Sequence, residues 1–236
     1  MLQSLKNKKI LIVVAHPDDE ILGLGGTMSR LIRNFGITAK VIILGEGITS
    51  RSDNRDLDLW DTHLKEHRNN IYQAQKKIGY HEVSIHNFPD NRFDSVPLLE
   101  IIKVIEKEKE EFLPEVIFTH HGGDVNIDHQ RTFEAVVTCC RPMQDEVVKT
   151  IITFETMSGT EWRASTDPKH FIPNVFISID EQSLNDKIAA MECYEFEKRE
   201  YPHPRSPEAL KIVAQRWGIV VGVEYAEAFC LVRNIC

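Results

Sequence analysis

The stretch KILIVVAHPDDE, residues 9–20, decides the fold. Six apolar residues follow Lys9 without a polar interruption, which is typical of a strand covered on both faces of a parallel sheet. The apolar run stops at His16, too early for the hydrophobic part of a secretory signal and far too early for a membrane span. We therefore interpret it as the first buried strand of an α/β fold, followed by a polar loop.

The rest of the chain continues this pattern. Short β-branched segments alternate with helical patterns, as in successive βαβ units. Strands are expected at residues 9–15, 39–47, 83–88, 115–121 and 149–156, and helices near 21–34, 62–78, 98–112 and 130–140. A long loop (156–174), a strand (174–180), a helix (182–196), an irregular proline-rich stretch (201–207), a helix (208–217) and an apolar segment (227–233) follow. We predict a Rossmann-like, mostly parallel sheet with helices on both faces, in a single domain over residues 1–236.

The composition narrows the classes of function. The chain has 236 residues, with 28 basic and 36 acidic side chains and a formal net charge of -8. A dedicated nucleic-acid binder normally presents a basic face, so we expect no nucleic-acid partner. The five cysteines, Cys139, Cys140, Cys193, Cys230 and Cys236, form no CxxC pair. We interpret them as reduced thiols of a cytoplasmic protein.

Two loops concentrate the side chains that bind metals. HPDDE, residues 16–20, follows the first strand, and HHGGDVNIDH, residues 120–129, follows the fourth. Ligands of open parallel sheets bind outside the carboxyl ends of the strands, where such loops converge. A catalytic zinc site needs three protein ligands and one open position, and these loops can supply them. A helix-capping role for Asp18 or Asp19 is the alternative.

The two motifs resemble those of the PIG-L/LmbE family of zinc-dependent N-deacetylases. This family includes the N-acetylglucosaminyl-phosphatidylinositol de-N-acetylase and the deacetylases of mycothiol and bacillithiol biosynthesis. The resemblance rests on AHPDDE, residues 15–20, and on the downstream Asp128-His129 pair, and it covers roughly the first 130 residues. It implies zinc held by His16, Asp19 and His129, with Asp18 as the general base. Another divalent ion, such as Fe2+, is left open.

The chemistry of these residue types agrees with that implication. Zinc lowers the pKa of a bound water from about 15.7 to about 7, so a nearby carboxylate can take its proton near neutrality. The expected reaction is hydrolysis of the linear amide C–N bond of an N-acetylglucosamine-like sugar, which gives acetate and a free amine. We expect Asp128 to orient a neighbouring catalytic side chain.

One position departs from the family pattern. Many members carry a histidine three positions before the last zinc ligand, where this chain has Asn126. An amide can donate a hydrogen bond to an oxyanion but cannot deliver a proton. The acid role therefore falls to Asp18, or to a histidine such as His121 or His203. A structural role for either histidine is the alternative.

Substrate contacts are expected from the remaining loops. Arg51, Arg92, Asp94, His121 and Arg163 all lie in segments that follow strands. Carboxylates bind sugar hydroxyls and arginines bind phosphate in a bidentate way. Together they suggest an amino sugar with an anionic group, such as a nucleotide-sugar, a sugar phosphate or a glycoconjugate intermediate. Ordinary solvation of surface loops is the alternative for each residue.

Other interpretations compete with the enzyme. A catalytically impaired metal- or sugar-binding module of the same fold is compatible with Asn126. The interpretation as a nucleotide-binding domain rests only on the fold and on Gly23, Gly25 and Gly26. These glycines do not complete the G-x-G-x-x-G pattern, because residue 28 is Met. We expect these glycines to pack the first helix against the sheet. Assembly into a homo-oligomer is left open.

Overall fold

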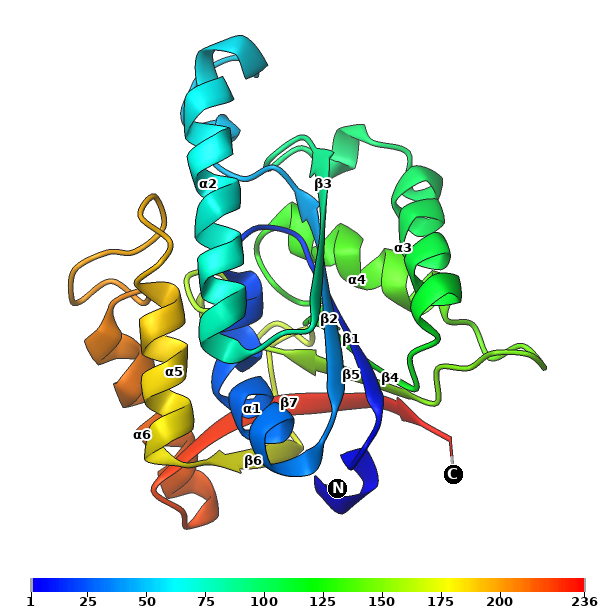
Figure 1. Ribbon diagram of the computed structural model, residues 1–236, viewed down its shortest axis with the longest axis vertical. Helices are drawn as coiled ribbons and strands as arrows, with labels where there is room; N and C mark the ends of the chain where they lie inside the picture. The colour runs from blue at the N-terminus through cyan, green and yellow to red at the C-terminus, as the bar shows by residue number, and fades with distance from the viewer. Residues whose placement is uncertain (1, 236) are drawn as a thin grey trace.

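In the computed structural model, which describes residues 2–235, seven strands form one central sheet (Figure 1). They are β1 (Lys9–Val14), β2 (Thr38–Gly45), β3 (Glu82–Phe88), β4 (Val116–His120), β5 (Thr150–Phe154), β6 (Val175–Ile179) and β7 (Tyr225–Asn234). Their order across the sheet is β3-β2-β1-β4-β5-β7-β6. Strands β1 to β5 are parallel, whereas β7 runs antiparallel to both β5 and β6. The prediction of a mostly parallel, Rossmann-like sheet is confirmed.

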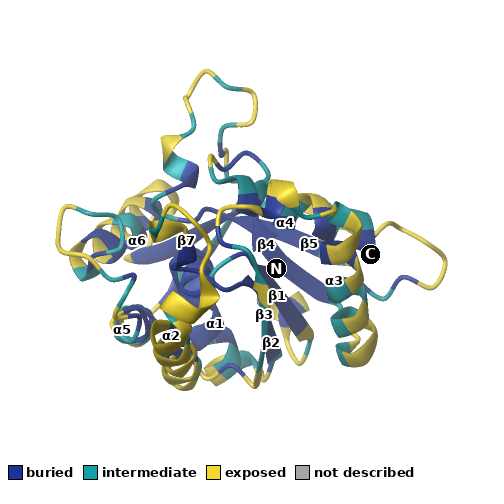
Figure 2. Cartoon of the chain, turned by 90° about the horizontal axis from the view of Figure 1, so that it is seen from above, coloured by how far each residue is buried: buried dark blue, intermediate teal, exposed yellow. Residues whose placement is uncertain are grey.

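Helices cover both faces of this sheet. One face packs against α1 (Asp19–Phe35), α2 (Leu57–Ile78) and α5 (Glu181–Met191), and the other against α3 (Leu98–Phe112) and α4 (Ile127–Cys139) (Figure 1). Helix α6 (Pro207–Val221) packs against β7. Short 3-10 turns lie at Leu2–Leu5, Thr49–Arg51, Phe93–Ser95 and Thr160–Trp162. Figure 2 shows the central strands as buried and the outer faces of the helices as exposed.

Several boundaries differ from the predicted ones. Helix α2 begins at Leu57 rather than near residue 62, because the Asp56 carboxylate caps it by accepting the N–H groups of Asp58 and Leu59. Helix α5 ends at Met191 rather than at residue 196.

The proline-rich stretch is also more ordered at its end than predicted. Pro207 opens α6, at a position where a helix needs no backbone N–H, and the Ser206 side chain accepts the N–H of Ala209. The chain between α5 and α6, residues 192–206, is called the connecting segment below.

The start of α4 places two predicted site residues. The helix begins at Ile127, and the Asn126 side chain caps it by accepting the N–H of Asp128. Asp128 and His129 therefore lie in the first turn of a helix, which fixes their side chains at the carboxyl end of β4 more firmly than a loop would.

Gly23 and Gly26 allow α1 to approach the sheet closely, as the sequence predicts, whereas Gly25 faces Lys187 of α5. A Cβ on Gly23 would lie 2.2 Å from the ring of Phe154. The backbone of α1 leaves helical geometry at Leu24, and the N–H groups of Gly26 and Thr27 donate to the Glu227 carboxylate of β7. The break in the helix is thus capped by a side chain from the last strand.

Two further observations bear on the sequence predictions. Cys139, Cys140, Cys193 and Cys230 are free thiols, and Cys236 lies outside the described residues. None of the helices within residues 2–235 combines the length and the apolar character that crossing a membrane requires.

The close approach at Gly23 gives a test of the packing. We expect Gly23→Ala to lower the free energy of unfolding by about 1–3 kcal/mol, because the added methyl group displaces the Phe154 ring in a filled core. Gly25→Ala is the matched control, since its Cβ would lie 3.3 Å from Lys187. Urea denaturation of both variants measures the difference. Equal stability of the two variants would contradict this account of α1.

Candidate metal centre and pocket

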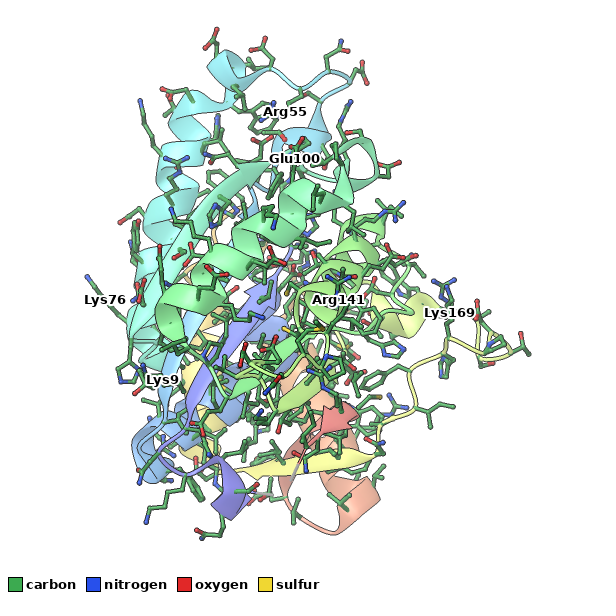
Figure 3. All side chains as sticks on the ribbon, turned by 90° about the vertical axis from the view of Figure 1, so that its right-hand side faces the viewer. Lys9, Arg55, Lys76, Glu100, Arg141 and Lys169 are labelled. Carbon is green, nitrogen blue, oxygen red and sulfur yellow. The ribbon has the colours of Figure 1, made fainter. Side chains whose placement is uncertain are left out.

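The site lies at the carboxyl ends of β1 and β4, which are neighbours in the sheet. Strand β1 has β2 on its other side, and β4 has β5. The chain therefore continues from β1 and from β4 in opposite directions across the sheet, which leaves a crevice between the two loops. Figure 3 shows Lys9, which begins β1, and Arg55, which follows β2, at opposite ends of the sheet. The loops discussed below lie at the Arg55 end.

A single carboxylate oxygen occupies the centre of the site. Asp19 Oδ2 lies 3.5 Å from His16 Nδ1, 3.3 Å from His120 Nε2 and 3.4 Å from His129 Nε2. It also accepts the backbone N–H of His16 at 2.8 Å. Burial alone would raise the pKa of Asp19, but His129 and His120 outweigh it and hold that pKa well below its ordinary value. Asp19 is therefore a buried anion among imidazoles.

Each of the two outer histidines has a second carboxylate behind it. His16 Nε2 lies 2.8 Å from Asp128 Oδ2, and His129 Nδ1 lies 3.1 Å from Asp124 Oδ2. The remaining nitrogens, His16 Nδ1 and His129 Nε2, both face Asp19. Carboxylates that orient histidines in this way are typical of metal sites, because they fix the ring and make the free nitrogen more basic.

The residues present fit a divalent metal. One ligand atom each from His16, Asp19 and His129 lies within 4.8 Å of the others. Within residues 2–235, His129 Nε2 is buried without a hydrogen-bond partner. Burial alone would lower the pKa of His129, but Asp19 and Asp124 raise it to about 9. A buried imidazole nitrogen that lies among carboxylates and has no hydrogen-bond partner is suited to bind a metal cation.

His120 plays a different part beside this triad. Its Nε2 accepts the N–H of Ala15 at 2.9 Å, and its Nδ1 lies 2.9 Å from Thr156 Oγ1. The ring stacks on that of His129 with centroids 3.9 Å apart. With both nitrogens engaged, His120 supports His129 and leaves coordination to the other side chains.

A second group of side chains that could bind a metal shares His16 with the triad. His16, Asp90 and Asp128 also lie within coordinating distance of one another. Asp128 Oδ1 accepts the N–H of Phe93, and Oδ2 accepts the N–H of Asn91 as well as facing His16. Both oxygens are occupied by protein donors, so Asp128 holds the loop after β3 and orients His16.

Asp18 differs sharply from its neighbour Asp19. It precedes α1 with φ of 102° in the left-handed region, and its side chain makes no capping hydrogen bond. Oδ2 is buried, has no hydrogen-bond partner in the described part of the chain, and lies 3.1 Å from Arg205 Nη1. Burial raises the pKa of the Asp18 carboxyl, and the Arg205 guanidinium opposes that rise. Backbone strain of this kind is found where function fixes a side chain.

A cavity of about 320 Å³ opens above these residues. Among the predicted site residues, it brings together His16, Asp18, Arg51, Asn126, His129 and His203. The Asn126 side chain is already engaged, because its Nδ2 donates to Asn91 Oδ1 and its Oδ1 caps α4. His203 Nδ1 accepts the N–H of Arg205, which leaves Nε2 as the nitrogen available for proton exchange.

Four predicted substrate residues do not line this cavity. Arg92 and Asp94 are exposed on the loop after β3. His121 Nε2 lies 3.0 Å from the carbonyl oxygen of Lys169. Arg163 donates to the carbonyl groups of Gly123 and Asp124, at 2.7 and 3.0 Å, and so holds the loop that carries Asp124.

The cavity also contains residues that the sequence did not indicate. Asp90 accepts the N–H of Ser50 and lines the cavity, whereas the sequence favoured its neighbours Arg92 and Asp94. The connecting segment contributes Glu197, Arg199 and Arg205. Asp90 follows a strand end and so carried a usable signal, whereas in the connecting segment the sequence indicated only His203.

Comparison with known proteins identifies relatives of this chain. Residues 11–140 match the family model of PIG-L, described as GlcNAc-PI de-N-acetylase. The chain is 30% identical over 191 residues to the uncharacterized deacetylase YaiS of Escherichia coli K12. The aligned region covers 79% of this chain and 90% of that protein. The matched range includes both loops of the metal triad.

Solved structures share the fold at lower identity. N,N'-diacetylchitobiose deacetylase of Pyrococcus horikoshii matches with a TM-score of 0.71 at 18% identity, over 96% of this chain and 84% of that one. GalB, the 4-carboxy-2-hydroxymuconate hydratase of Pseudomonas putida KT2440, matches with a TM-score of 0.68 at 18% identity, over 97% and 98%. The fold thus accompanies both a deacetylase and a hydratase, and the reaction must be argued from the site.

The charge state of His129 predicts how the stability of the metal-free protein depends on pH. Its folded pKa of about 9 exceeds the ordinary 6.5. The resulting stabilisation, about 3 kcal/mol, is complete below pH 6.5 and is lost as pH rises through about 9. Urea denaturation at pH 6.5 and pH 9 measures it. His129→Gln should show a smaller difference, and an unchanged difference would mean that His129 is not the titrating group.

Proposed function

Because the chain belongs to the PIG-L family of GlcNAc-PI de-N-acetylases, we propose that it is a metal-dependent N-deacetylase of an amino sugar. The reaction adds water across the acetamide C–N bond and releases acetate and a free amine. The observation that carries this proposal is the pair of adjacent carboxylates. Asp19 lies among three imidazoles, whereas Asp18 lines the cavity and faces Arg205.

The metal would be held by His16, Asp19 and His129, with zinc as the ion that this mixture of imidazole and carboxylate favours. When bound, it supplies positive charge that acidifies a water molecule and offsets charge on the acetamide oxygen. Asp128 and Asp124 keep the two histidine rings oriented for this task.

Asp18 would move the proton. As general base it takes a proton from the attacking water, and as the protonated acid it returns that proton to the departing amine. The raised pKa of its carboxyl suits both steps. Asn126 cannot deliver a proton, and its amide is engaged by Asn91. His203, which lines the same cavity and whose Nδ1 accepts the N–H of Arg205, is the second group available to protonate the amine.

The cavity supports an N-acetylglucosamine-like substrate with an anionic group. Asp90 offers an acceptor for sugar hydroxyls, and Arg199 and Arg51 line the same space, Arg51 with Glu197 as its partner. A bound divalent cation would add two further positive charges. Three acidic side chains that line the cavity, Asp18, Asp90 and Glu197, offset its three arginines, so the charge of the cation would favour a sugar phosphate, nucleotide-sugar or acidic glycoconjugate over a neutral sugar.

Exchange of Asp18 tests the proposed roles. We expect Asp18→Asn to retain bound metal and to lose acetate-releasing activity by about 10²–10⁴-fold, because the amide cannot accept the proton of water. His16→Ala and His129→Ala should lose both the metal and the activity. Elemental analysis of purified protein and an acetate-release assay measure the two effects.

Two outcomes would decide against these roles. Undiminished turnover in Asp18→Asn would remove the general base from the mechanism. A wild-type protein that holds metal but releases no acetate from a broad panel of N-acetyl sugars would favour the impaired binding module.

The substrate panel also tests the anionic group. We expect kcat/KM on N-acetylglucosamine phosphates to exceed that on neutral N-acetylglucosaminides by about 10-fold or more, which corresponds to one charge-assisted contact. The preference should weaken as ionic strength rises. Equal kcat/KM on both substrate classes would remove the case for an anion-binding subsite.

A further inference from the structure

We propose that Arg205 is a positioning residue that holds the Asp18 carboxylate toward the cavity and away from the metal triad. This proposal rests on the proposed function, since it concerns the group assigned there as general base. The two carboxylates are adjacent in sequence and both are buried, with 1% relative exposure each. Their different roles must therefore come from the groups that surround each carboxylate.

The side chain of Asp18 has few other contacts. Its backbone N–H donates to Glu20 Oε2 at 3.2 Å, which fixes the backbone but not the carboxylate. Oδ2 has no hydrogen-bond partner within the described residues, and the guanidinium of Arg205 is the cation that faces it. Without this guanidinium, a cation held by the triad that includes the adjacent Asp19 would attract the Asp18 carboxylate.

Arg205 is itself held rigidly. Its Nε donates to Ser158 Oγ at 3.0 Å, and its Nη1 donates to Glu197 Oε2. The other oxygen of Glu197 accepts Arg51 Nη2 at 2.6 Å. Glu197 is buried, so it is an anion shared by two arginines rather than a solvated surface group. The guanidinium that meets Asp18 therefore has a fixed place.

The connecting segment that carries Arg205 is anchored at both ends. The hydroxyl of Tyr194, which is fully buried, donates to Glu20 Oε1 at 2.6 Å. At the other end, Ser206 caps α6. Glu20 thus ties the connecting segment to the turn that contains Asp18, and Arg205 adds a second link between them.

Removal of the guanidinium should change kinetics in a specific way. We expect Arg205→Ala to lower kcat by about 100-fold with little change in KM, because Asp18 is misplaced while the substrate contacts remain. Arg205→Lys should recover part of the activity, and added guanidinium ion at non-denaturing concentration should restore part of it to Arg205→Ala. Arg33→Ala, which breaks an exposed pair with Asp180, is the control for loss of an arginine.

A spectroscopic measurement tests the proposal independently of turnover. With Co2+ in place of the natural metal, visible absorption reports the coordination number of the ion. We expect Arg205→Ala to show weaker absorption than the wild type, because Asp18 becomes an added ligand. The double variant Asp18→Asn, Arg205→Ala should return to the wild-type spectrum and be no less active than Asp18→Asn alone.

The outcomes separate the two proposals. Inactivity of the wild type on every N-acetyl sugar would overturn the function, while the cobalt spectra would still test the positioning. Unchanged kcat and an unchanged spectrum in Arg205→Ala would overturn the positioning role. A loss of activity that guanidinium does not rescue, with a wild-type spectrum and a lowered melting temperature, would overturn it in favour of a structural role.

Discussion

The convergence of three imidazoles on one oxygen of Asp19 is the interaction on which the rest of the structure depends. A buried carboxylate is costly unless positive charge or donors surround it. His16 comes from the end of β1, whereas His120 ends β4 and His129 opens α4. These groups meet at one edge of the sheet because β1 and β4 are parallel neighbours. The order of the strands therefore determines which charges surround Asp19.

Adjacent residues acquire opposite chemistry through their surroundings. Asp19, the first residue of α1, is held as an anion chiefly by His129, while Asp18 adopts left-handed backbone geometry and turns to the cavity. The difference arises from groups far apart in the chain. Glu20 completes the turn by accepting the N–H of Asp18 and the hydroxyl of Tyr194. Each acidic residue of the AHPDDE motif thus has a distinct environment.

Much of the fold and part of the site could be predicted from the sequence. The buried strands and the two ligand-bearing loops have local patterns, and parallel topology brings them together. The roles of Arg163 and His121 could not be predicted, because their contacts are with backbone carbonyl groups of distant loops. The roles of Glu197 and Arg205 could not be predicted either, because the sequence pattern around them indicates only the end of a helix and an irregular stretch. The residues of the AHPDDE motif could be identified from the sequence, whereas the side chains that position them depend on tertiary contacts.

The break in α1 has a consequence for the order of folding. The N–H of Thr27 is satisfied by Glu227, 200 residues later in the chain, and the same carboxylate pairs with the buried Lys187 of α5. Contacts of such sequence separation form late, because the entropy of closing the intervening chain must be overcome first. We therefore expect the helix that carries Asp19 to reach its final geometry only after β7 has docked. In that order of events, the candidate ion site at the AHPDDE motif of a nascent chain would be complete only once the last strand is in place.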